Sequence, residues 1–154
     1  MKFRIFTTLI FLAYGCSFAG VETEEVTVKL GPKYFRDGDV IRIDSVESTS
    51  PNLEPGDQVT VHGKYRLDSQ KEAMLALFLT QTEGDGLEET DSTQWIDAKR
   101  GWREFCVSIT IKHRGYLHLS FYDQDTGQGF GGVYFGTAKQ ISEKMVVSVD
   151  DFTK

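Results

Sequence analysis

The sequence predicts an all-β fold: a single antiparallel β-sandwich over residues 20–154, after a signal peptide over residues 1–19. Hydrophobic and polar residues alternate in short windows, no window keeps a helical period, and turn residues separate the windows. The composition is 40% hydrophobic and 26% charged with only 2 cysteines, which is typical of a globular chain held together by its core. The strand order, whether jelly-roll or immunoglobulin-like, stays open.

The order of residues at the N-terminus predicts the signal peptide. Lys2 and Arg4 precede an apolar run over residues 5–14, which is shorter than the roughly 20 residues of a membrane-spanning helix. Small residues follow in Ser17-Phe18-Ala19, so we expect cleavage before Gly20. A buried N-terminal strand or helix is the alternative. The mature chain is then expected to be extracytoplasmic, periplasmic or secreted, with no transmembrane span.

Cys16 allows a second route of export. Gly15-Cys16 follows the apolar run as in a bacterial lipobox, although the residues before it match that motif poorly. A lipid on Cys16 would anchor the protein to a membrane. Cleavage after Ala19 would instead remove Cys16 and leave Cys106 as a lone structural thiol.

The alternation predicts eight strands in the mature chain, at residues 25–30, 41–43, 59–67, 73–79, 105–111, 116–122, 130–136 and 145–149. Turn residues such as Asp37-Gly38 and Pro55-Gly56 separate the first of them. The segment Ala73–Leu79 is apolar on both faces. We expect it to form a central strand covered on both sides, with a buried helix as the alternative.

The strands at residues 105–111 and 116–122 predict a hairpin, because His113-Arg114-Gly115 forms a compact turn between them. Leu117, Leu119 and Phe121 then alternate inward. The outer side of the second strand presents four candidate ligand-binding residues, beside Ser108, Thr110 and Lys112 of the first: Tyr116, His118, Ser120 and Tyr122. Tyrosine faces and hydrogen-bonding groups on a sheet suit sugar rings. Aromatic residues also suit a pleated surface without any ligand, which is the alternative.

A segment at residues 94–103 combines both tryptophans with three basic residues. Such a combination favours stacking on sugars or contact with anions. We assign Trp95 to the candidate ligand site. We expect Trp102 to be structural, at one end of the core, and the whole segment to cover Cys106.

Asp123 and Asp125 are the candidate metal ligands, because two carboxylates separated by one residue are frequent in loops that bind hard cations such as calcium. The acidic loop at residues 83–91 could add oxygen ligands, although charged surface loops are usually only solvated. Gly127 and Gln128 do not fit a calcium loop of the EF type. An ordinary turn is therefore the favoured interpretation, and no cofactor is expected.

No catalytic motif is recognisable in the sequence. His62, His113 and His118 fall in no catalytic or zinc-binding pattern, although His62 and His118 could be neighbours if their strands were adjacent. The net charge of −6 argues against a nucleic-acid surface, which normally carries a basic excess. We expect a protein that is not an enzyme and has a carbohydrate or a protein as its partner.

Three segments share features with known proteins: Pro55-Gly56-Asp57 before a strand, residues 115–122, and Gly129-Phe130-Gly131-Gly132-Val133-Tyr134-Phe135-Gly136-Thr137. Together they resemble a group of exported bacterial β-sandwich proteins of uncharacterised function, over about residues 38–138. The resemblance implies export and a sandwich fold, and it supplies no catalytic residue. The paired glycines also predict a close approach to a neighbouring backbone.

The leading functional interpretation is a non-catalytic extracytoplasmic binding or adhesion module for a carbohydrate or an envelope component. A structural or protein-interaction domain without a small ligand is the alternative, and it would use a sheet edge or face. A hydrolase ranks third, because no acid and base pair is readable.

Overall fold

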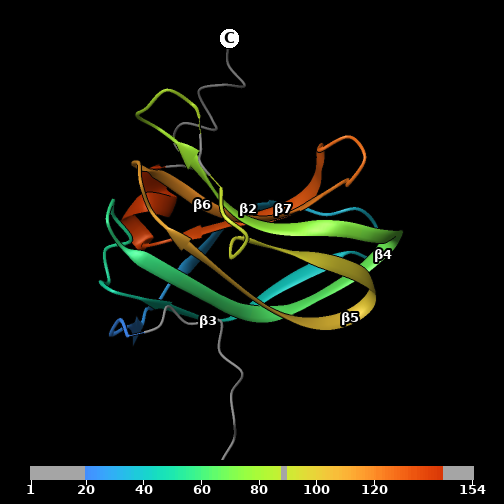
Figure 1. Cartoon of the computed structure of the whole chain (residues 1–154), viewed down its shortest axis with the longest axis horizontal. Helices are drawn as coiled ribbons and strands as arrows, with labels where there is room; N and C mark the ends of the chain where they lie inside the picture. Colours follow the sequence, from blue (N-terminus) through green and yellow to red (C-terminus); the bar gives the residue numbers. More distant parts are fainter. Residues whose placement is uncertain (1–19, 88–89, 144–154) are drawn as a thin grey trace, which may run out of the picture.

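The computed structural model describes residues 20–87 and 90–143. Their strands form one antiparallel sheet in the order β1-β3-β4-β6-β7-β2, with β5 paired to β4 (Figure 1). The all-β, antiparallel prediction is confirmed at this level. The strands are β1 (Glu24–Glu25), β2 (Lys29–Tyr34), β3 (Val40–Ser48), β4 (Gln58–Gln81), β5 (Trp95–Thr110), β6 (Gly115–Tyr122) and β7 (Gly129–Gly136).

Strand β4 is the longest strand and organises the sheet. Its first half pairs with β3, its second half pairs with β6, and β5 follows it along both halves. The prediction of separate strands at 59–67 and 73–79 is wrong, because one strand contains both. The pairing with β5 is irregular between Leu67 and Glu72, where the chain bulges instead of turning. No Gly or Pro occurs in this stretch to start a turn.

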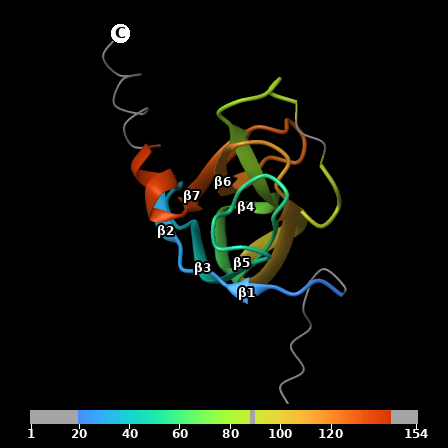
Figure 2. The same ribbon diagram turned by 90° about the vertical axis from the view of Figure 1, so that its left-hand side faces the viewer.

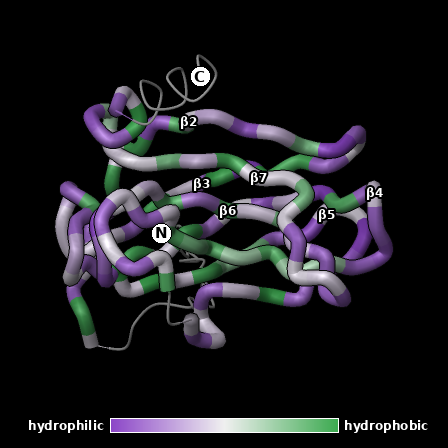
Figure 3. The backbone as a smooth tube through the Cα atoms, turned by 90° about the horizontal axis from the view of Figure 1, so that it is seen from above, coloured by the Kyte–Doolittle hydropathy of each residue, from purple (hydrophilic) through white to green (hydrophobic). Residues whose placement is uncertain are grey.

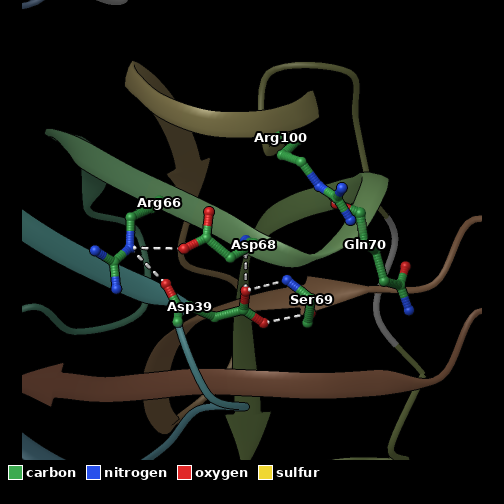
Figure 4. Close-up of polar contacts among 7 residues, drawn as sticks. Asp39, Arg66, Asp68, Ser69, Gln70 and Arg100 are labelled. Carbon is green, nitrogen blue, oxygen red and sulfur yellow. Dashed lines mark hydrogen bonds and ion pairs between the residues drawn. The ribbon is translucent and has the colours of Figure 1, made fainter.

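The buried carboxylate of Asp39 holds this bulge. Asp39 is 3% exposed, and its Oδ1 accepts hydrogen bonds from the backbone amides of Asp68 and Ser69 at 2.8 and 2.9 Å. Its Oδ2 accepts one from the Ser69 hydroxyl at 2.6 Å (Figure 4). The Arg66 guanidinium adds a bond to the Gly38 carbonyl at 2.6 Å. The turn before β3 is thereby fastened to the middle of β4.

The hairpin predicted from residues 105–122 does not form. Each of β5 and β6 pairs with β4, and β6 pairs with β7 on its other side. The turn at residues 112–114 bonds instead to other loops, since Thr82 N donates to the Arg114 carbonyl at 2.9 Å. The chain does turn at these residues. However, the second half of β4 lies beside β6, in the place that β5 would have taken in a hairpin.

The sheet curls around its core, as the end view shows (Figure 2). Alternate residues of β4, β5 and β6 point inward and are buried, including Leu67, Leu77 and Leu119 at 0% exposure. Residues of β2 and β3 face each other across a hollow of about 340 Å³, where no ladder joins the two strands within the described ranges. The core therefore lies inside the curl.

Two further predictions are corrected at the chain ends of the described region. The strand predicted at 25–30 divides into β1 and the start of β2. A short helix forms at residues 138–143, where none was expected. Thr137 caps it, because Gln140 N donates to Thr137 Oγ1 at 3.3 Å and Thr137 N donates to Gln140 Oε1 at 2.9 Å.

Several predictions lie outside the described residues: the signal peptide, the Cys16 lipobox and the strand at 145–149. Within the described residues, no helix is long and apolar enough to cross a membrane.

Candidate functional site

The outer face of β6 lies between β4 and β7. Leu117, Leu119 and Phe121 are buried at 3, 0 and 0%, and the alternate residues His118, Ser120 and Tyr122 are partly exposed. The predicted alternation of this strand is therefore confirmed. The residues beside the outer set are those of β4 and β7, not Ser108, Thr110 and Lys112 as expected from a hairpin.

His118 is the centre of a hydrogen-bonded aromatic cluster on this face. Its Nε2 lies 3.1 Å from the Tyr122 hydroxyl, and its Nδ1 lies 3.4 Å from Thr80 Oγ1. Thr80 Oγ1 also lies 3.2 Å from the Tyr134 hydroxyl. The ring centroid of Phe78 lies 5.4 Å from that of Tyr122. These contacts order the side chains of β4, β6 and β7 into one surface.

A groove of about 370 Å³ opens beside this cluster, over β6, β7 and β2. These three strands run side by side in the view from above (Figure 3). Three of the candidate ligand-binding residues, His118, Ser120 and Tyr122, line the groove. Tyr34 on the edge strand is 71% exposed and forms one of its sides. The other lining residues are Pro32, Lys33, Gly129, Phe130, Gly131, Gly132, Val133 and Tyr134.

Gly132 makes the floor of this groove flat. It pairs with Ser120 on β6 and with Tyr34 on β2. A Cβ atom at Gly132 would lie 2.1 Å from Ser120 Oγ and 2.6 Å from the Leu119 carbonyl oxygen. The predicted close approach of a neighbouring strand is therefore present. Any side chain here would fill the space between Tyr34 and Ser120.

Tyr116 and Trp95, the other two predicted ligand residues, lie outside this groove. Tyr116 is 8% exposed and lines a separate hollow with Lys139, Gln140 and Glu143, at the short helix. Burial raises the pKa of its hydroxyl, and the nearby Glu143 carboxylate raises it further. Trp95 is 38% exposed on β5 and lines a hollow of about 230 Å³ on the other side of the cluster.

The predicted metal ligands Asp123 and Asp125 belong to the loop between β6 and β7. Asp123 Oδ1 accepts hydrogen bonds from Asp125 N, Thr126 N and Thr126 Oγ1 at 3.1, 2.9 and 3.0 Å. The bonds from Thr126 hold the pKa of the Asp123 carboxyl below its usual value. In the described part of the chain, no group of three or more His, Cys, Asp and Glu residues is arranged to hold a metal ion.

The structural role expected of Trp102 is wrong. This side chain is 48% exposed on β5, and the Arg66 guanidinium lies 5.6 Å from its ring centroid. Residues 95–103 continue the strand that contains Cys106 and do not fold over it. Cys106 is disulfide-bonded in the uncleaved chain, whereas the expectation of a lone thiol concerns a chain cleaved after Ala19. Its Sγ lies 3.8 Å from His62 Nε2, whereas His118 has other partners in a different part of the sheet.

The sequence interpretation missed four residues of this surface: Phe78, Thr80, Tyr134 and Tyr34. Phe78 was assigned to a strand without a known neighbour and Thr80 to its flank, and pairing of β4 with β6 brings both to His118. Tyr34 precedes a turn, and nothing local shows that β2 pairs with β7. The signal available was in β7, where Gly132 and Tyr134 are two residues apart and therefore lie on the same face of the strand.

Comparison with known proteins adds nothing to this geometry, because no family model, curated protein or solved structure matches the chain.

Proposed function

We propose that the protein is a non-catalytic binding module and that it holds a carbohydrate in the groove over β6, β7 and β2. The observation behind this proposal is the exposed ring of Tyr34 opposite an ordered cluster of aromatic and hydrogen-bonding side chains. A sugar presents a flat apolar face and a rim of hydroxyl groups. Tyrosine rings match the face, and Ser120, Lys33 and the tyrosine hydroxyls match the rim.

The hydrogen bonds of His118 support an ordered binding surface. Both ring nitrogens of His118 are within hydrogen-bonding distance of neighbouring hydroxyls, from Tyr122 and Thr80. A histidine held this way orders the rings around it, which reduces the entropy lost when a ligand binds. The proposal keeps a location outside the cytoplasm, based on the order of residues 1–20. It also keeps the β-sandwich class, which the curl of the sheet supports.

A glycan array tests the proposal with the wild-type chain and two variants on β2. Tyr34→Ala should weaken binding by at least about tenfold, which corresponds to about 1.4 kcal/mol. Leu30→Ala is the matched control, because Leu30 is 57% exposed on the same strand and lines another hollow. Equal effects of the two changes would contradict the groove as the site. A wild-type chain that binds no glycan would favour the protein-interaction alternative.

A further inference from the structure

The outer edge of β3 is covered by another strand along only part of its length. Strand β1 pairs antiparallel with the end of β3, and Val26 N extends this pairing by donating to the Val46 carbonyl at 2.8 Å. The chain then leaves β3, because β2 pairs with β7. Within the described ranges, no strand takes the place of β1 beside residues 40–44 of β3. The same edge is therefore covered at one end and free at the other.

The hollow of about 340 Å³ between β2 and β3 lies along this free stretch. Figure 2 shows both strands on the same side of the curled sheet as β1. Four consecutive residues of β3 line the hollow, so the edge of the strand borders the space as well as one of its faces. Six of the lining residues are apolar: Leu30, Phe35, Val40, Ile41, Ile43 and Val133. The hollow thus combines apolar side chains with backbone groups that can still form hydrogen bonds.

The charge of this hollow is opposite to that of the whole chain. The chain has a net charge of −6, whereas the charged residues that line the hollow are Lys33 and Arg42. Both are exposed, and neither forms an ion pair within the part of the chain that the structure describes. An acidic side chain of a partner would therefore be attracted to this position.

The edge along β5, which pairs with β4 alone, has a different character. Gly101 interrupts its regular backbone with a φ of 95°. Five charged residues of this strand are exposed: Asp97, Lys99, Arg100, Arg103 and Glu104. Charged side chains and backbone irregularities at an edge hinder pairing with another chain. Residues 40–43 of β3 are mainly apolar and keep a regular register with β4, so the free part of β3 is the better edge for pairing.

From these observations we propose that residues 40–44 of β3 bind an extended segment of a partner protein by strand addition. The added segment runs antiparallel to β3, in line with β1, and forms backbone hydrogen bonds with it. Its alternate apolar side chains enter the hollow, and an acidic side chain lies beside Lys33 and Arg42. Pro32 has no N–H group and the register of β2 is irregular around it, so β2 supplies side-chain contacts only.

Three capped, fluorescently labelled peptides test this proposal with the full chain. The parent peptide is Val-Thr-Val-Thr-Val-Thr-Val, and the other two carry aspartate or lysine in place of the central threonine. Fluorescence anisotropy should show the tightest binding for the aspartate peptide and the weakest for the lysine peptide.

A variant of Arg42 tests the charge contact. Arg42→Gln should weaken binding of the aspartate peptide by about three- to fivefold, as expected for an exposed ion pair, and leave the parent peptide unchanged. Arg103→Gln is the matched control, because it removes the same charge from the edge along β5. Lys33 also lines the proposed carbohydrate groove, so Arg42 is the residue that separates the two sites.

Backbone methylation of the peptide distinguishes strand addition from apolar contact alone. Alternate N–H groups of an extended strand point to opposite edges, so N-methylation of alternate residues blocks one edge and leaves the other free. Of two aspartate peptides methylated at the two alternate sets of residues, one should lose binding and the other should keep it.

Four results would overturn the proposal. Equal effects of the two methylation patterns would show that the backbone of the peptide does not pair. Changes of amide chemical shift along β5 in place of residues 40–44 would put the peptide on the other edge. A dimer in sedimentation that the peptide dissociates would assign the edge to a second copy of the chain. Binding of none of the peptides would reject strand addition, whereas the glycan array tests the carbohydrate groove separately.

Discussion

The two faces of β6 differ although they alternate along a single strand. On the inner face, Phe121 packs its ring 5.9 Å from that of Tyr65 and 5.8 Å from that of Phe130. On the outer face, His118 and Tyr122 meet through a hydrogen bond and remain partly exposed. The inner residues stabilise the fold by apolar burial, and the outer residues build a surface. The difference teaches that one strand can supply the core and the candidate site independently.

The largest expected effect tests this difference directly. Phe121→Ala should lower the free energy of unfolding by about 3–5 kcal/mol, because it opens a cavity among buried rings. Tyr122→Ala should cost only about 1 kcal/mol, since it mainly loses a net hydrogen bond at a partly exposed position. Denaturant unfolding of both variants provides the comparison. If Tyr122→Ala were as destabilising as Phe121→Ala, the outer face would be part of the core.

A second change crowds the outer face without touching the core. Gly132→Ala should cost about 1–3 kcal/mol, because its Cβ would overlap Ser120 Oγ and the Leu119 carbonyl oxygen. The double variant Gly132→Ala with Ser120→Gly should recover part of the loss, since it removes one of the two overlaps. Thermal unfolding of the single and double variants measures this. A Gly132→Ala chain as stable as wild type would mean that β6 and β7 can separate at little cost.

The two faces of β6 also show how much of the structure could be predicted from the sequence. The alternation of Leu117, Leu119 and Phe121 with His118 and Ser120 is a local pattern, and it identified the strand and both of its faces. The neighbours of β6 were not predictable from local signals, because β4 and β7 are distant in sequence.

Two errors have the same physical origin. The bulge in β4 depends on Asp39, which is remote from it in the chain. Because the sequence does not show this contact, the residues before Ala73 look like a gap between two strands. The exposure of Trp102 follows from the pairing of β5 with β4 alone. Local patterns describe a strand, whereas pairing decides which side chains gather at a site.

Tyr116 sharpens the comparison, because it belongs to the outer face and is nevertheless buried. Its pKa is raised from 10.0, so the folded state binds its proton more tightly than the unfolded state. The resulting stability is fully present below pH 10 and is lost as the pH rises through the raised pKa. Tyr116→Phe should therefore unfold with a weaker dependence on pH above that value. Unfolding curves at alkaline pH that are parallel for both chains would contradict the burial of this hydroxyl.

The smallest effect is expected in the loop that follows β6. Hydrogen bonds from Thr126 lower the pKa of Asp123 from 3.8, so its contribution is present above that pH and is lost as the pH falls through the lowered value. Asp123→Asn should be less sensitive to acid than wild type in thermal unfolding below pH 4. Asp125→Asn removes the same charge from the same loop and serves as the control. An equal change in both variants would show a general charge effect in place of the local bonds.

The long strand β4 has a consequence for how the chain reaches this structure. Two of its three partners, β5 and β6, follow it in the sequence, and the pairing of Gln58 with Thr110 closes a long stretch of chain. Contacts of high sequence separation slow folding, because the entropy of closing the loop is lost before the contacts stabilise the chain. During synthesis or export, the edges of β4 that β3 does not cover stay unpaired until β5 and β6 are available, and an unpaired edge is prone to aggregate. The same strand that joins the two halves of the folded sheet is its most vulnerable segment while folding is incomplete.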